Sequence, residues 1–188
     1  AAGLGADVSI LDINMDRLRY LDDVMDKNIT TVYSNTHNIL SQIKKSDLII
    51  GAVLIVGEKA PNLITKDMLK VMSKGSVIVD VAVDQGGCVE TCKATTHKDP
   101  TFVVDDILHY CVSNMPGAVP HTSTLALTNI TLPYISSMVS LGVEKALAAD
   151  NSLLNGLNMY KKHITHEGVA STFNIEYIDP SELIQIDT

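Results

Sequence analysis

The chain has 188 residues, of which 46% are hydrophobic, so it can bury the core of one or two domains. Its formal net charge is -8 and its Lys and Arg residues form no cluster, which argues against binding to nucleic acid. No apolar run approaches the roughly 20 residues of a membrane span, and no basic leader precedes an apolar stretch. We therefore expect a cytoplasmic protein that binds small molecules and keeps its three cysteines reduced.

Apolar segments alternate with segments of helical periodicity over the first part of the chain. The expected strands are 8–12, 30–33, 47–54, 77–83, 101–104 and 110–113. The expected helices among them are 16–24, 35–43 and 65–72. This alternation predicts the α/β class, with a Rossmann-like, doubly wound parallel sheet. Residues 1–5 resemble a last helical turn ended by glycine, so we expect the first βα unit of this sheet to be missing.

Beyond Pro116 the alternation of strands and helices stops. One long helix is expected over 124–149, with a kink or break near Pro133, and short helices over 152–160 and 167–173. We therefore predict two parts, a nucleotide-binding domain over 1–120 and a helical segment of a second domain over 121–188.

The segment 77–88 is the most informative stretch for function. Its run of Val and Ile ends in Asp84 and continues into Gly86 and Gly87. Ligands of open α/β sheets bind beyond the carboxyl ends of strands, and glycine lets the backbone approach a ligand closely. We expect Asp84 to lie partly desolvated at a strand end, where it orients a group or exchanges a proton, with a turn acid as the alternative. Asp80 is expected to bond a neighbouring loop, because a buried unpaired carboxylate is costly.

Asp12 ends the first expected strand. An acid at this place in a dinucleotide-binding fold accepts hydrogen bonds from the adenosine ribose and disfavours the 2′-phosphate of NADP. Two alternatives stay open, a helix cap and the ribose-binding acid of a methyltransferase. The glycine-rich turn that accompanies such an acid would lie outside this chain.

Metal binding is not expected. Cys88, Cys92 and His97 lack the short spacing and the fourth ligand of a structural zinc site. His163 and His166 lie in a polar segment where a solvated or capping role is favoured over a metal site or a proton relay.

Four segments in order resemble bacterial alanine dehydrogenases over nearly the whole chain. They are Gly-Ala-Val-Leu at 51–54, Lys-Ala-Pro-Asn-Leu-Ile-Thr at 59–65, GSVIVDVAVDQGGC at 75–88 and NMPGAVPHTST at 114–124. The resemblance implies an NAD-dependent enzyme that oxidises L-alanine to pyruvate and ammonia. It also implies an NAD domain inserted into a substrate domain, and a hexamer.

The resemblance assigns roles to individual residues. Asp84 matches the catalytic acid near the nicotinamide. Matches to cofactor-contacting positions are Asp12, Arg17, Ser34, Val53, Leu54, Val81, Ala82, Val83, Asp84, Lys93, Val112, Ser113, Asn114 and Met115. Lys93 stands where relatives often carry Arg, and an ammonium cannot form the forked contact of a guanidinium.

The family's catalytic His and its substrate-binding Lys and Arg belong to a domain that these residues do not include, so we expect this polypeptide alone to be inactive. The nearest alternative is the NAD(H)-binding subunit of proton-translocating transhydrogenase, which shares the fold. The order Asp84-Gln85 favours the dehydrogenase. A non-catalytic nucleotide-binding module and a methyltransferase that binds S-adenosylmethionine also stay open.

Overall fold

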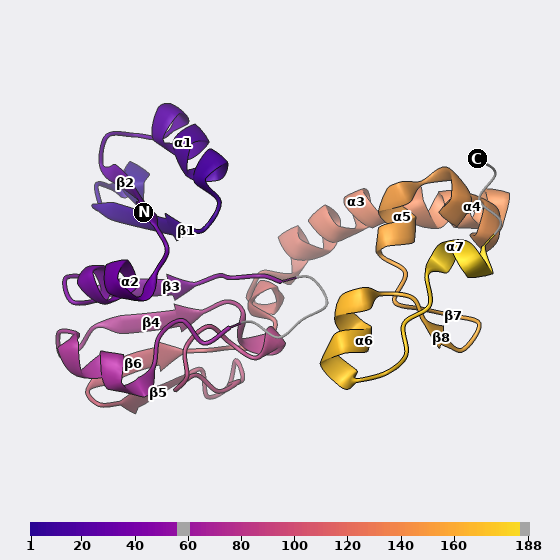
Figure 1. Ribbon diagram of the computed structural model, residues 1–188. Helices are drawn as coiled ribbons and strands as arrows, with labels where there is room; N and C mark the ends of the chain where they lie inside the picture. Colours follow the sequence, from indigo (N-terminus) through magenta and orange to yellow (C-terminus); the bar gives the residue numbers. More distant parts are fainter. Residues whose placement is uncertain (56–60, 185–188) are drawn as a thin grey trace. The chain divides into compact units, whose positions relative to one another are not determined.

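The computed structural model describes residues 1–55 and 61–184, which fall into two compact units (Figure 1). The first unit contains Ala1–Val53 and Pro61–Ser113, and the second contains Leu54 and the segment from Asn114 onward. In the described part of the chain, no helix has both the length and the apolar character that a membrane crossing requires. The boundary near residue 120 and the assignment of the two parts to a cofactor domain and a substrate domain stay predictions.

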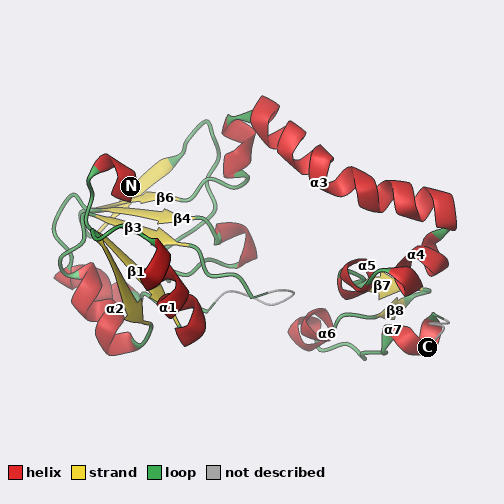
Figure 2. Ribbon diagram, turned by 90° about the horizontal axis from the view of Figure 1, so that it is seen from above, coloured by secondary structure: helices red, strands yellow, loops and turns green. Residues whose placement is uncertain are grey.

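Parallel strands joined by helices form the first unit (Figure 2). Its strands are β1 (Val8–Asp12), β2 (Ile29–Tyr33), β3 (Leu48–Gly51), β4 (Val77–Asp80), β5 (Thr101–Val104) and β6 (Ile107–Tyr110). Its helices are α1 (Met15–Val24) and α2 (Thr36–Ile43), with 3₁₀ helices at Ala2–Leu4, Lys66–Val71 and Val83–Gln85. The predicted α/β class is confirmed, and the short helix expected over 65–72 is a 3₁₀ helix at Lys66–Val71.

The described strands of the first unit form two separate sheets, and the expected parallel arrangement is confirmed for all of them except β5. β1 and β2 form a parallel pair, while the other sheet has the order β3-β4-β6-β5. Within that sheet β3, β4 and β6 are parallel, and β5 runs antiparallel to β6. The two sheets share no strand pairing within the described residues. The reason for the antiparallel strand is the tight turn at Asp105 and Asp106, both at positive φ, which reverses the chain.

β4 lies between β3 and β6, and its side chains form part of the hydrophobic core of the first unit. Ile78 on β4, Ile107 on β6 and Leu69 are almost fully buried. The burial of each such side chain contributes about 1.5–3 kcal/mol to the free energy of folding. The strand predicted over 77–83 ends at Asp80 instead, because the chain then turns into the 3₁₀ helix Val83–Gln85.

Two other predicted strands have different ends. The strand expected over 47–54 ends at Gly51, and its side chains Leu48 and Ile50 are half exposed because β3 is an edge strand. The strand expected over 110–113 ends at Tyr110, because the turn at Asp105 and Asp106 starts it earlier.

The second unit is mainly helical. Its elements are a 3₁₀ helix (Met115–Ala118), α3 (Pro120–Leu141), α4 (Val143–Ala149), α5 (Asn151–Asn155), β7 (Met159–Tyr160), β8 (His163–Ile164), α6 (Glu167–Phe173) and α7 (Pro180–Leu183). α6 matches its prediction, but the helix expected over 152–160 is shorter and is followed by the β7–β8 hairpin. The long helix continues through Pro133 and breaks at Gly142, whose φ of 82° and ψ of 155° are not helical.

Candidate functional site

The predicted cofactor residues of the first unit follow the carboxyl ends of its parallel strands. Asp12 is the last residue of β1, and Ser34 follows β2 directly. Val53, Val81 and Val112 come shortly after β3, β4 and β6. Parallel strands of one sheet end at a shared edge, which is where ligands of α/β proteins bind. Each described parallel strand is thus followed, at its carboxyl end, by a predicted cofactor-binding residue or ends in one.

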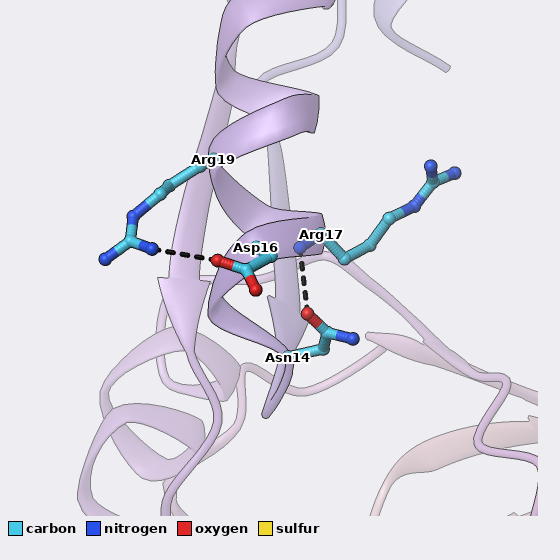
Figure 3. A network of polar contacts seen from close by, with 4 residues as sticks. All are labelled: Asn14, Asp16, Arg17 and Arg19. Atoms are coloured by element: carbon cyan, nitrogen blue, oxygen red, sulfur yellow. Dashed lines mark hydrogen bonds and ion pairs between the residues drawn. The ribbon is translucent and has the colours of Figure 1, made fainter.

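Asp12 shapes the turn between β1 and α1. One of its carboxylate oxygens accepts a 2.8 Å hydrogen bond from the Asn14 N–H. Asn14 in turn caps α1, because its Oδ1 accepts a 2.9 Å bond from the Arg17 N–H (Figure 3). The alternative that Asp12 itself is the helix cap is therefore wrong. The Ser34 N–H donates to the Asp12 carbonyl at 2.9 Å, which places these two residues side by side.

The side chains of Arg17 and Arg19 on α1 extend in different directions (Figure 3). The Arg17 guanidinium lies 5.1 Å from the centroid of the Tyr20 ring. Arg19 instead forms a 2.9 Å ion pair with Asp16. Both partners of that pair are largely exposed, so it contributes little to stability.

The segment 81–84 does not have the geometry predicted for it. Asp84 is exposed on the 3₁₀ helix Val83–Gln85, whereas a partly desolvated carboxylate at the strand end was expected. Val81 is also exposed, at 52%, but Ala82 and Val83 are buried. A ligand here can therefore contact the side chains of Val81 and Asp84, and only the backbone of the two residues between them.

Asp80 is the acid that actually ends β4, and it is fully buried. Its carboxylate accepts hydrogen bonds from the N–H groups of Ala82 at 3.0 Å, Cys88 at 2.8 Å and Val89 at 3.3 Å. The prediction that Asp80 bonds a neighbouring loop is confirmed. The hydrogen bonds from these three amides offset the free-energy cost of removing the carboxylate from water.

Lys93 takes part in a stack that was not predicted from the sequence. Its Nζ lies 4.8 Å from the centroid of Phe102, whose ring stacks on His109 with centroids 5.0 Å apart. The His109 Nδ1–H donates to the Ile107 carbonyl at 2.9 Å, which leaves Nε2 to accept from the Thr91 hydroxyl at 2.8 Å. Burial lowers the pKa of His109, which favours the neutral form of the ring. Phe102 and His109 face each other across the β5–β6 hairpin, which was not predicted because the second strand was expected to begin at residue 110.

Cys88 and Cys111 are buried, and Cys92 is half-buried. Cys88 is 2% exposed, and its Sγ accepts a 3.4 Å hydrogen bond from the Val53 N–H. Burial raises the pKa of Cys88, and a hydrogen bond to Cys111 together with burial raises the pKa of Cys92. Within the described ranges, no group of three or more His, Cys, Asp or Glu side chains could hold a metal ion.

The remaining predicted residues follow β6, except Leu54, which follows β3. Val112 is buried, and the Ser113 N–H donates to the Thr95 carbonyl at 3.1 Å. Leu54, Asn114 and Met115 belong to the second unit, so the structure does not place them relative to the others.

Comparison with known proteins identifies a family. The model of the alanine dehydrogenase/PNT C-terminal domain matches residues 1–167. The alanine dehydrogenase of Staphylococcus haemolyticus (strain JCSC1435) is 54% identical over 188 residues, which are 100% of this chain and 50% of that protein. Alanine dehydrogenase 2 of Staphylococcus aureus (strain USA300) is 53% identical over 187 residues, 99% of this chain and 50% of that protein. The chain thus spans about half the length of these relatives.

Solved structures give the same result. An L-alanine dehydrogenase superposes with a TM-score of 0.79 and 47% identity, covering 92% of this chain and 48% of that one. A transhydrogenase from Sinorhizobium meliloti superposes with a TM-score of 0.65 and 25% identity, covering 76% of this chain and 41% of that one. The resemblance drawn from the sequence is confirmed.

Proposed function

The chain belongs to the alanine dehydrogenase/PNT C-terminal domain family, and we propose that it carries the NAD-binding part of an NAD-dependent alanine dehydrogenase. The complete protein oxidises L-alanine to pyruvate and ammonia. The observation that supports this most strongly is the position of the predicted residues, after the carboxyl ends of all the parallel strands of the first unit.

The residues at these strand ends suit the parts of a dinucleotide. The half-buried Asp12 carboxylate accepts hydrogen bonds from the adenosine ribose, with Ser34 beside the adenine and Arg17 close by on α1. The same negative charge disfavours the 2′-phosphate of NADP. Val81 offers exposed apolar surface to the nicotinamide ring. Val53, Leu54, Ala82, Val83, Lys93, Val112, Ser113, Asn114 and Met115 complete the proposed contacts.

Asp84 is the proposed catalytic residue. When bound, NAD supplies the hydride acceptor, so the protein has to orient the substrate and move protons. Asp84 stands on an exposed turn beside Val81, where a carboxylate can reach a bound substrate and exchange a proton with it. The substrate-binding side chains belong to the other half of the protein.

The strand order supports a larger sheet in the complete protein. In the Rossmann order 3-2-1-4-5-6, β2 and β1 take positions 3 and 2, while β3, β4 and β6 take positions 4, 5 and 6. No described strand takes position 1. We assign that position to the first βα unit, whose glycine-rich turn binds the pyrophosphate. The half-exposed Leu48 and Ile50 of β3 become covered when this unit is present.

The second unit is the proposed carboxyl-terminal part of the substrate domain, and the complete protein is a cytoplasmic hexamer. α3 contains no Asp, Glu, Lys or Arg, and its Leu127, Ile130 and Val139 side chains are 64%, 68% and 81% exposed. An apolar helix of this kind needs a covering surface. Sedimentation of the full-length protein tests the assembly, which a mass other than that of six chains would contradict.

The dehydrogenase is favoured over the transhydrogenase subunit because both the TM-score and the identity are higher for the former. The test is the absorbance of NADH when full-length protein is mixed with NAD and L-alanine. We expect NADH to form without any added partner, and a transhydrogenase subunit would form none. The 188-residue polypeptide alone is expected to form none either, since it spans half of its relatives.

A thermal-shift comparison separates the dehydrogenase from a methyltransferase and from a non-catalytic nucleotide-binding module. We expect NAD to raise the melting temperature of the full-length protein and S-adenosylmethionine to leave it unchanged. The opposite result would identify a methyltransferase. Stabilisation by NAD without any alanine-dependent NADH would identify a non-catalytic module.

A further inference from the structure

We propose that Asp80 is a positioning residue for the reaction, because its buried carboxylate fixes the turn on which Asp84 stands. The inference rests on the proposed function for the role of Asp84. The anchoring itself rests only on contacts within the first unit.

The turn between Ala82 and Val89 is closed at both ends by one side chain. The Asp80 carboxylate accepts from the Ala82 N–H at the start of the turn, and from the Cys88 and Val89 N–H groups at its end. Asp84 lies between these two attachment points. Moving the carboxylate therefore moves both ends of the segment that carries the proposed catalytic residue.

Hydrogen bonds inside the turn transmit the constraint. The Gln85 and Gly87 N–H groups both donate to the Ala82 carbonyl, at 2.9 and 3.0 Å. The Gly86 N–H donates to the Val83 carbonyl at 3.1 Å. The turn is consequently a closed unit, and its orientation depends on how its ends are held.

Two glycines leave room for the Asp80 carboxylate. A Cβ on Gly87 would lie 2.8 Å from Oδ2, and a Cβ on Gly51 would lie 3.3 Å from Oδ1. The Val81 N–H also donates to the Gly51 carbonyl at 2.8 Å, which joins the end of β3 to the beginning of the turn. The Asp80 carboxylate therefore lies against the backbone at Gly51 and Gly87, where a larger residue would place a Cβ close to it.

The experiment is a double-mutant cycle in the full-length enzyme. Asn at position 80 keeps the shape of the side chain, but one of its two ends is an NH2 group that cannot accept, so at least one of the three amide donors loses its acceptor. We expect Asp80→Asn to lower kcat on the order of 10²-fold through misplacement of Asp84, with the KM for L-alanine nearly unchanged. In an Asp84→Asn background the same change should cost little further. Equal fold losses in the two backgrounds would overturn the positioning role.

Asp106→Asn is the matched control, because Asp106 lies on the same unit but forms an exposed ion pair with Lys74. It should leave kcat unchanged. If Asp80→Asn does not accumulate as folded protein, Gly51→Ala replaces it, because the added Cβ pushes on Oδ1 without deleting the carboxylate. Its loss of kcat should likewise disappear in the Asp84→Asn background, and an undiminished loss would overturn the proposal.

Hydrogen exchange separates this inference from the proposed function. In Asp80→Asn at least one of the amides of Ala82, Cys88 and Val89 should exchange faster, while the Leu108 amide, which donates to the Ser76 carbonyl, should stay protected. Unchanged exchange at Ala82, Cys88 and Val89 would show that the Asp80 carboxylate does not hold the turn, and would overturn this inference. Absence of any alanine-dependent NADH in the wild type would overturn the proposed function instead, and the exchange result would still decide the anchor.

Discussion

The Asp80 carboxylate accepts a 2.8 Å hydrogen bond from the N–H of Cys88, so the last residue of β4 holds the far end of the turn that carries Asp84. A charged acceptor makes such a bond stronger than a neutral one, about 1.5–3 kcal/mol. The geometry around this bond depends on Gly87, whose φ is 76°.

Gly87→Ala should destabilise the protein by about 2–4 kcal/mol, through the left-handed backbone and the contact with Asp80. Gly75→Ala is the matched control, because Gly75 has φ 83° but nothing within 4 Å of an added Cβ. Gly75→Ala should lose only about 1–2 kcal/mol of the free energy of unfolding. Thermal unfolding of the two variants measures the difference, and equal losses would show that Asp80 tolerates the added methyl group.

Lys162→Gly should stabilise the protein by about 1 kcal/mol. Lys161 and Lys162 form the turn of the β7–β8 hairpin at φ 46° and 73°, a conformation in which a side chain is strained. Thermal unfolding gives the change. Lys162→Ala keeps the Cβ and loses the charge, so it should bring no such gain. If Lys162→Ala raised the stability as much as Lys162→Gly does, the stabilisation would come from loss of the lysine charge and not from relief of backbone strain.

Stability should fall as the pH drops through the normal titration range of histidine, about pH 7 to 5. Burial lowers the pKa of His109 in the folded protein, so the unfolded chain binds this proton more readily and acid favours unfolding. Melting temperatures across this range should therefore vary less in His109→Gln than in the wild type. His37→Gln, at an exposed position on α2, should keep the wild-type slope. If the melting temperature of His109→Gln depends on pH as strongly as that of the wild type, His109 is not the source of this pH dependence.

Asp12→Arg should weaken NAD binding and reduce the preference for NAD over NADP, because the charge that repels the 2′-phosphate becomes attractive. The ratio of kcat/KM for the two cofactors measures the preference in the full-length enzyme. Asp16→Arg is the control, because it makes the same charge change in the first turn of α1, at an exposed residue that pairs with Arg19. If Asp12→Arg leaves the ratio unchanged, Asp12 does not bind the ribose.

Local patterns predicted much of the fold. β1 and α6 have the expected bounds, because each combines a clear periodicity with capping or turn residues at its ends. The end of β4 was missed because Val81 and Val83 continue the β-branched pattern. The turn after Asp80 is set by hydrogen bonds to Cys88 and Val89, which are remote in sequence.

The places of the candidate site residues in the fold were predictable to a similar degree. Asp12 and Ser34 were located correctly at strand ends, since a strand followed by a helix is visible in the sequence. The exposure of Asp84 and the stack of Lys93, Phe102 and His109 were not predictable, because they depend on tertiary packing. The same holds for the break at Gly142, where the backbone conformation and not the nearby Pro133 ends α3.

The most direct test of the account is the turnover of Asp84→Asn in the full-length protein, measured as alanine-dependent NADH formation beside its melting temperature. Asparagine keeps the size of the exposed side chain and removes its charge and its proton exchange. We predict a fall in kcat of roughly 10²–10⁴-fold with a melting temperature close to that of the wild type. A kcat equal to that of the wild type would contradict the catalytic role of Asp84.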